Sequence, residues 1–275
     1  MNYRIKYMLG SSILLFLAAL IFIWLVFNPY SPTITNLTEK NELPSQIHWF
    51  GTDELGRDLF ARSIQGLQIS FLIGLLAAGI DLTIGILWGT IAAFSSRTVD
   101  KFMMYVADGI YSLPYLLVVI LVSVLIGTGL FPLVISMVIM GWIQMARTTR
   151  ILVKTSLHTE YVLSAKTLGA SSFRLFVWHI LPNIVGPILT AGMLSVPHAI
   201  FTEAFLSFLG IGIQPPTASL GSMVSDALPA MRFYPCRLLF PASFVSLLIF
   251  SIMLLADGLR DIYDPKQHLN EKNIV

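Results

Sequence analysis

Two carboxylates in apolar surroundings are the clearest candidates for chemistry in this sequence. Asp81 lies near the middle of the apolar run 69–94, and Glu203 lies within the run 184–208. A charged side chain at the centre of a bilayer costs about 2.5–3.5 kcal/mol on insertion scales, so it faces a bundle interior, pairs or takes up a proton. Each carboxylate therefore either lines the path of a transported solute or makes a structural hydrogen bond between helices. We favour the hydrogen bond for Asp81 and leave both possibilities open for Glu203.

Patterns for metal, nucleotide or covalent chemistry are missing from the sequence. A phosphate-binding loop has the pattern G-x-x-x-x-G-K-[ST], and no such run occurs. No nucleophile, base and orienting acid cluster at a common depth. Five histidines lack the spacing of metal ligands: His48, His158, His179, His198 and His268. We therefore predict a protein that is not an enzyme and binds no metal or cofactor; if ATP drives it, another polypeptide binds the ATP.

The composition places these residues in a membrane protein. Of 275 residues, 56% are hydrophobic and 12% are charged, about half the charged share of an average soluble domain. So few charges cannot cover the surface of a soluble protein of this size, and lipid is the expected solvent. The net charge of +2 is too small to indicate a nucleic-acid partner.

Six segments are long and apolar enough to cross a bilayer as helices. A spanning helix needs about 20 mostly apolar residues, because each advances about 1.5 Å through a core about 30 Å thick. The uncharged stretch between Asp108 and Arg147 is too long for one span and divides at Gly127-Thr128-Gly129. The predicted spans are 8–27, 69–94, 105–126, 131–149, 184–208 and 238–256.

The basic residues predict an orientation. With the N-terminus inside, twelve Lys and Arg residues fall in cytoplasmic segments and five fall outside. Cytoplasmic loops are enriched in Lys and Arg, so both termini are predicted to lie in the cytoplasm.

Five of the twelve inside charges lie in the segment 147–182, which is predicted to form two short helices. Gly169 ends the first, 156–168, in the position of a helix C-cap. The second spans 173–181, and Pro182 marks the turn back into the membrane. The first helix either docks in a groove of a partner or lies on the lipid surface. Its apolar residues recur on one face: Leu157, Tyr161, Ala165 and Leu168.

On the outer side, a helix is predicted to lead into the second span. Thr52 is its expected N-cap. Along it an apolar stripe could lie against the bundle: Phe60, Ile64, Leu67 and Phe71. By itself this pattern indicates only an amphipathic helix.

The run 160–182 resembles the signature loop of ATP-binding-cassette importer permeases. That signature has an acidic residue, two alanines, three variable residues, a glycine, nine variable residues and a hydrophobic residue two before Leu-Pro. Four residues match at the right spacing: Ala165, Gly169, Leu181 and Pro182. Three depart from it: Leu163 at the acidic position, Ser164 and His179. Glu160 lies one helical turn before the usual acidic residue.

Other stretches resemble one branch, the C-type permeases of the oligopeptide, dipeptide and nickel importers. The first is Phe50-Gly51-Thr52-Asp53-Glu54-Leu55-Gly56-Arg57-Asp58, a hallmark of that branch. The others are 203–223 and Asp257-Gly258-Leu259-Arg260-Asp261, followed by Asp264-Pro265. Together the resemblance covers roughly residues 48–266.

The resemblance implies an all-α integral membrane protein with the type I ABC importer permease fold. It has six transmembrane helices and a cytoplasmic coupling helix between spans four and five. We expect an N-terminal span and extracytoplasmic segment over 1–68, and a permease domain over 69–275 with its coupling loop at 150–183. The residues implied to contact an ATPase are Glu160, Ala165, Gly169, Leu181 and Pro182.

The resemblance also implies a function and partners. The protein would be the translocation subunit of an ATP-driven importer of oligopeptides or dipeptides in a bacterial plasma (inner) membrane. Its partners would be a second, homologous permease, two cytoplasmic ATP-binding subunits and an extracytoplasmic solute-binding protein. The alternative is a secondary transporter or channel that needs no ATPase. Such proteins show internal repeats and ionisable residues placed for ion coupling, and only Asp81 and Glu203 fit that pattern.

Overall fold

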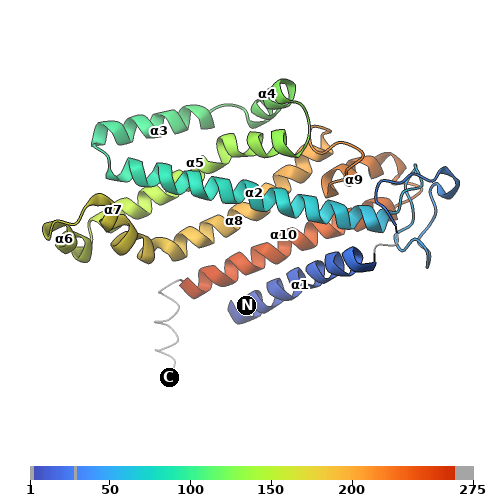
Figure 1. Cartoon of the computed structure of the whole chain (residues 1–275), viewed down its shortest axis with the longest axis horizontal. Coiled ribbons are helices and arrows are strands. Elements are labelled where there is room, and N and C mark those ends of the chain that lie inside the picture. The colour runs from blue at the N-terminus through green and yellow to red at the C-terminus, as the bar shows by residue number, and fades with distance from the viewer. Residues whose placement is uncertain (1–2, 28–29, 264–275) are drawn as a thin grey trace.

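The protein is built from helices (Figure 1). A computed structural model describes residues 3–27 and 30–263, and within them the β-structure is limited to an isolated bridge between Thr52 and Asp58. The predicted motif residues Asp264-Pro265 lie outside the described residues. The α-helices are α1 (Tyr3–Phe27), α2 (Leu59–Phe94), α3 (Arg97–Tyr111), α4 (Tyr115–Ile126), α5 (Leu130–Leu157), α6 (Glu160–Thr167), α7 (Ser172–Arg174), α8 (Leu181–Phe208), α9 (Leu220–Ala227) and α10 (Cys236–Tyr263). The described residues also form two 3₁₀ helices, Leu37–Glu39 and Leu228–Ala230, and a π-helix, Leu175–Ile180.

Five helices in the described part of the chain are long and apolar enough to cross a membrane. They are α1, α2, α5, the continuous helix Ser172–Phe208 that contains α8, and α10. α3 and α4 pass the same test only as a pair, which is bent by 79° at the break between them. The pair makes a sixth span if it is counted as one.

The predicted third span, 105–126, is not one continuous helix. α3 ends at Tyr111, and α4 begins at Tyr115 directly after Pro114. Pro114 has no N–H group to continue the hydrogen bonds of α3, and its ring disfavours a helical backbone at Leu113. The apolar run therefore contains a sharp bend that hydropathy does not register.

Helix α2 lies at the centre of the bundle and packs on α5 and α8. Small residues allow this close approach. A Cβ atom on Gly85 would overlap with Met145 of α5, and one on Gly74 would overlap with Ile200 of α8. α1 and α10 pack against each other, and Lys6 pairs with Asp261 at 2.8 Å.

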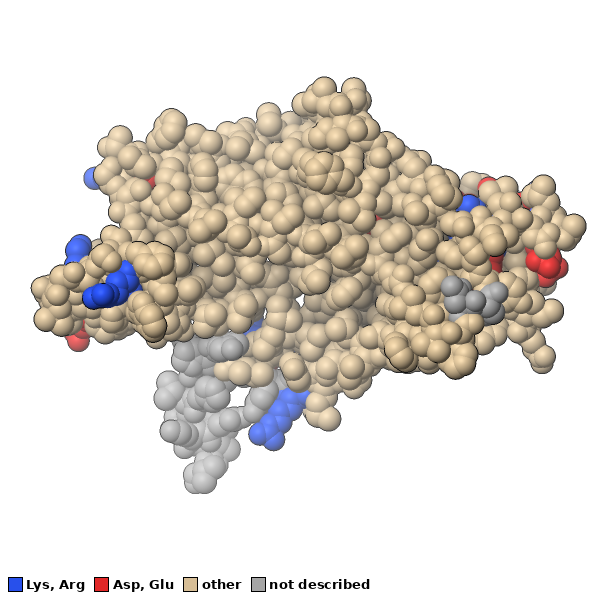
Figure 2. All heavy atoms as spheres, in the orientation of Figure 1, with Lys and Arg blue, Asp and Glu red and all other residues tan. Residues whose placement is uncertain are grey.

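The bundle has two different ends (Figure 1). At the loop end, α6, α7 and the π-helix project beyond the other helices. At the cover end, residues 30–58, which we call the cover segment, lie beside α9 at the ends of α2 and α10. On the face seen in Figure 2, charged side chains gather mostly toward the two ends, and the middle is largely uncharged.

Candidate functional site

The projecting helix α6 begins at Glu160, later than predicted. α5 continues to Leu157, and the chain turns at His158 and Thr159 before α6. The backbone of Thr159 is extended, with ψ 147°, and its hydroxyl donates a hydrogen bond to the carbonyl of Ser156 at 2.6 Å. The predicted helix 156–168 therefore wrongly joined the last turn of α5 to α6.

Gly169 ends the projecting helix, as predicted. Its φ is +84°, in the left-handed region. The N–H of Gly169 donates to the carbonyl of Lys166 at 3.0 Å, and the N–H of Ala170 donates to the carbonyl of Ala165 at 3.1 Å. This pair of bonds is the Schellman motif. Apart from the adjacent backbone, no atom of residues 3–27 or 30–263 lies within 4 Å of the missing Cβ, so the backbone conformation, and not lack of space, favours glycine here.

Pro182 does not mark a turn, contrary to the sequence prediction. The helix Ser172–Phe208 is continuous, and the π-helix runs directly into α8. In the π-helix an N–H bonds to the carbonyl five residues earlier, as Leu181 does to Phe176. This change of hydrogen-bond register comes just before Pro182, which has no N–H to donate. The predicted helix 173–181 is therefore the first part of a much longer one.

The buried face of α6 differs from the predicted one. Val162 and Ala165 point inward and belong to a cluster with Leu175 and Ile180. Of the predicted face, Ala165 is buried, Leu157 is partly buried, and Tyr161 and Leu168 are exposed. The predicted spacing runs across the turn at 158–159, where the helical phase is lost.

Three large apolar side chains at the loop end face outward; Leu168 belongs to the predicted apolar face of the first helix, but sequence reasoning did not select Phe173 or Trp178. Leu168 is 89% exposed, Phe173 is 76% exposed and Trp178 is 73% exposed. Lys166 and Arg174 are exposed beside them in the chain. The three residues sit after α6, on α7 and on the π-helix, so no single helical period relates them. We call Leu168, Phe173 and Trp178 the loop surface.

The five residues implied to contact an ATPase do not all face outward. Glu160, Gly169 and Pro182 are exposed. Ala165 and Leu181 pack inward with the cluster beneath α6. Outward and inward residues of the signature therefore have different structural roles.

Helix α5, which carries the loop, is braced against α3 by ion pairs. Asp100 is 3% exposed and accepts hydrogen bonds from Arg150, at 2.6 Å from Nη2, and from Lys154. Two turns further along α3, Asp108 pairs with Arg147 at 2.6 Å. Ion pairs to α3 therefore hold the end of α5 from which the loop projects.

Asp53 is the centre of a buried ion-pair network in the cover segment. Its carboxylate accepts hydrogen bonds from the backbone N–H groups of Leu55 and Arg57, at 2.8 and 3.0 Å. It also accepts from Nε of Arg57 at 2.6 Å and from Nη1 of Arg62 at 3.1 Å. Asp53, Arg57 and Arg62 are 4%, 7% and 3% exposed. Since buried charges persist where they are paired and hydrogen-bonded, these motif residues hold the segment in its fold.

Asp58, and not Thr52, caps α2. The Asp58 carboxylate accepts the N–H of Ala61 at 2.7 Å, and α2 begins at Leu59. Oγ1 of Thr52 instead accepts the N–H of Glu42 at 2.8 Å within the cover segment. The predicted cap was wrong because the chain is not helical between these two residues.

The predicted apolar stripe at the start of α2 is confirmed. Ile64 and Leu67 are buried, and Phe60 and Phe71 are partly buried. Leu67 and Phe71 pack with residues of α1 and α10, and Ile64 and Phe60 pack around Trp24. The stripe fixes the first turns of α2 to the bundle.

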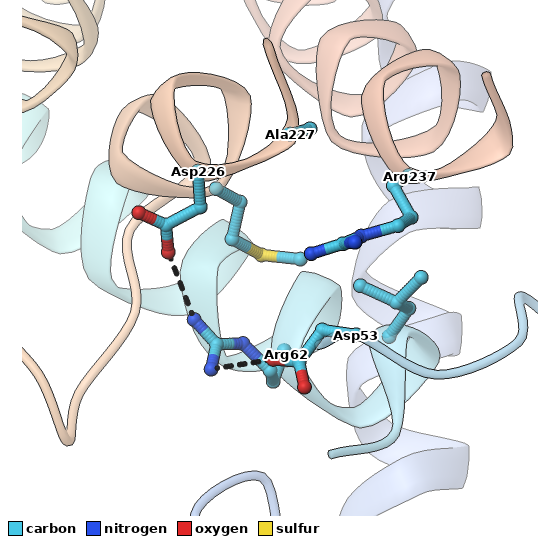
Figure 3. A pocket seen from close by; sticks show the side chains of 7 residues that line it. Asp53, Arg62, Asp226, Ala227 and Arg237 are labelled. Atoms are coloured by element: carbon cyan, nitrogen blue, oxygen red, sulfur yellow. Dashed lines mark hydrogen bonds and ion pairs between the residues drawn. The ribbon is translucent and has the colours of Figure 1, made fainter. Parts of the chain in front are cut away.

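The Asp53 network extends to α9 and α10 (Figure 3). Arg62 lies between Asp53 and Asp226 of α9, whose carboxylate is 3.5 Å from Nη2 of Arg62. Arg237, near the start of α10, is 5% exposed and donates to Asn41 of the cover segment at 3.1 Å. Burial raises the pKa of Asp226, and Arg62 opposes that rise. The cover segment is therefore tied to three helices, α2, α9 and α10.

Glu203 is fully buried and hydrogen-bonded. Its side chain is 0% exposed and accepts from Ser70 of α2 at 2.6 Å and from Ser207 at 2.8 Å. Because Ser70 belongs to α2, this carboxylate ties α8 to α2, which favours its structural interpretation.

Asp81 packs against α5, but within the described residues Oδ1 of its carboxylate does not make the hydrogen bond that we predicted. It is 9% exposed, and a Cβ atom on Gly141 would overlap with its carboxyl group. Oδ1 has no hydrogen-bond partner in the part of the chain that the structure describes. The favoured interhelical hydrogen bond is not made by this oxygen, so a role on a solute path stays a hypothesis.

Comparison with known proteins identifies the family. Residues 85–268 match the family described as "Binding-protein-dependent transport system inner membrane component". The chain belongs to this family. It is the membrane-spanning translocation subunit of an ABC importer, and the alternative of a secondary transporter or channel is set aside.

The relatives confirm the predicted branch. The chain is 47% identical over 259 residues to the oligopeptide transport system permease protein OppC of Bacillus subtilis, covering 94% of this chain and 85% of the relative. It is 46% identical over 260 residues to the dipeptide transport system permease protein DppC of the same organism, covering 94% and 81%.

A solved structure confirms the predicted class of fold. A chain of the MetNI methionine ABC transporter, in inward-facing conformations, matches with a TM-score of 0.60 and 12% identity. The match covers 73% of this chain and 95% of that chain. At this identity the likeness concerns the fold alone.

Proposed function

We propose that this chain forms, together with a second permease, the passage of an ATP-driven importer of oligopeptides or dipeptides. The observation that carries the proposal is the 47% identity over 94% of the chain to an oligopeptide permease. The dipeptide permease is almost equally similar, so the proposal names peptides as the cargo without a preferred length.

In this proposal the loop end and both termini lie in the cytoplasm, and the cover end lies outside in contact with a solute-binding protein. The distribution of twelve Lys and Arg residues inside and five outside supports this orientation. Two ATP-binding subunits dock at the loop end. They bind the ATP, because this sequence has no phosphate-binding loop, and the chain itself catalyses no reaction.

Helix α6 then transmits ATPase closure to the spans. Glu160 and the loop surface are exposed for contact. Val162 and Ala165 keep α6 on the start of the long helix Ser172–Phe208, and one short turn joins it to α5. A push on α6 therefore moves α5 and α8 together, as a rigid-body transition requires.

A coupling assay tests this function. The complex of both permeases and both ATPases is reconstituted in proteoliposomes, and peptide uptake and ATP hydrolysis are measured with the binding protein present. Gly169→Arg is expected to keep ATP hydrolysis and lose peptide uptake, because a bulky charged residue is placed at a left-handed backbone position beside the docking face. Ser96→Arg, exposed at the same end between α2 and α3, is the matched control and should transport normally.

Two outcomes would contradict the proposal at different levels. Normal uptake by Gly169→Arg would remove the coupling role of the loop. Absence of ATP-dependent peptide uptake by the unmodified complex would remove peptides as the cargo.

A further inference from the structure

The cover segment exposes apolar side chains although it lies between two candidate spans and belongs to neither. Ile34, Leu37, Leu43 and Ile47 are 68%, 69%, 66% and 65% exposed. Single exposed apolar residues are ordinary on protein surfaces. Four in one short, ordered segment indicate a surface that another body covers.

The charges exposed among these residues are mainly acidic. Residues 30–58 contain five acidic and two basic side chains. Asp53, Arg57 and Asp58 are buried and paired. The exposed or partly exposed remainder is Glu39, Lys40, Glu42 and Glu54, and Figure 2 shows acidic atoms at this end of the molecule.

This charge pattern distinguishes a protein partner from lipid. Segments that lie on a membrane surface combine apolar residues with Lys and Arg, which attract anionic headgroups. Here the exposed or partly exposed charges of the same segment are three carboxylates and one lysine instead. A partner with an apolar patch bordered by Lys and Arg complements the surface in both respects.

The surface is held on a fixed scaffold. The N–H of Asn36 donates to the carbonyl of Leu55 at 3.1 Å, and the N–H of Asn41 donates to the carbonyl of Asp53 at 3.0 Å. The loop that carries Leu37 is therefore bonded on both sides to the run that contains the Asp53 network. A surface that is ordered before binding loses less entropy on association.

We propose that Ile34, Leu37, Leu43 and Ile47, with their acidic neighbours, form the docking surface for the solute-binding protein. The family is named for its dependence on such a protein, and the inference rests on the proposed function, in which the cover end lies outside. The scaffold also gives docking a mechanical route into the bundle. Asn41 holds Arg237 of α10, and the Asp53 network reaches α2 and Asp226 of α9.

A binding measurement tests the surface. The complete transporter in nanodiscs is titrated with the peptide-loaded binding protein of the same transport system. The double variant Leu37→Ser/Leu43→Ser is expected to weaken binding about tenfold or more. Glu42→Lys/Glu54→Lys is expected to weaken it in low salt, with a smaller loss at high ionic strength. Val99→Ser, which changes an exposed apolar side chain on the first turn of α3, away from the cover segment and the loop surface, is the matched control and should bind the binding protein normally.

The outcomes separate this inference from the proposed function. Normal binding by both double variants would overturn the proposal that this surface docks the solute-binding protein. Its apolar residues would then contact lipid or the second permease. Failure of the unmodified transporter to bind the binding protein, or equal peptide uptake without it, overturns the proposed function itself. Should the serine variant fail to assemble, the lysine variant decides, because its two side chains are exposed.

Discussion

The cover segment and the projecting loop both carry exposed apolar residues, but different interactions hold the two regions in place. The cover segment is held by buried charges: its Asp53 pairs with Arg57 of the same segment and with Arg62 of α2. In the loop, the charges of Lys166 and Arg174 are exposed, and α6 is held by apolar packing of Val162 and Ala165. The shape of the cover segment is therefore set by its own ion pairs, whereas the position of α6 is set by the helices that it joins.

The largest effect is expected where the cover segment loses its central charge. Asp53→Ala leaves two buried arginines without their shared partner and should lower the free energy of unfolding by about 3–5 kcal/mol. Denaturant or thermal unfolding of the purified complex measures the loss. Glu54→Ala, the exposed neighbour, is the control and should stay within about 0.5 kcal/mol. A similarly small loss for Asp53→Ala would mean that water already solvates the network.

A smaller loss is expected at the base of the loop. Asp100→Ala should cost about 1.5–3 kcal/mol, the range for hydrogen bonds to charged groups. Arg150 and Lys154 are 27% and 38% exposed at their side chains, so water can solvate them once the carboxylate is gone. The same unfolding measurement applies, with exposed Lys101→Ala as the control. If Asp100→Ala lowers the free energy of unfolding as much as Asp53→Ala does, the ion pairs of the two regions do not differ in strength as we expect.

The turn after α6 should be less sensitive still. Gly169→Ala places a Cβ at φ +84° in open space, and the left-handed conformation costs about 1–2 kcal/mol. Amide hydrogen exchange across 160–167 should accelerate by the corresponding factor. Gly109→Ala, also in open space but within helix α3, should not be destabilising. Unchanged exchange in the Gly169 variant would show that the turn does not limit the opening of α6.

The smallest effect is expected for the exposed pair on the same base. Arg147 and Asp108 are 33% and 54% exposed at their side chains, and exposed pairs contribute about 0–1 kcal/mol. Arg147→Ala should therefore change unfolding little, and less at high salt. A loss above that of Asp100→Ala would reverse the order assigned to buried and exposed pairs.

The bundle and the glycine turn were predictable because their causes are local. Lipid requires long apolar helices, which composition reveals over each 20-residue stretch, as in α2 and α10. Gly169 combines a helix end with a residue that tolerates the left-handed region, and both signals lie within a few positions.

The sequence predictions failed where several local structures were possible and contacts with distant residues determine which one forms. Thr52, Asp53 and Asp58 can all cap a helix in sequence terms. Arg57 and Arg62 engage Asp53, and the N-cap role falls to Asp58. Glu203 likewise finds its partner Ser70 across 133 residues of chain, and no spacing rule relates such a pair.

The number of residues in the π-helix between α7 and α8 determines the direction in which α6 points. The helix Ser172–Phe208 is unbroken. The number of residues in its π-helical part, 175–180, therefore sets how far the preceding loop with α6 is rotated about the helix axis. Removing one residue would rotate α6 by about 100° relative to α8, since an α-helix has about 3.6 residues per turn. The direction in which α6 points is thus encoded as a count of residues, independently of which side chains occupy the segment.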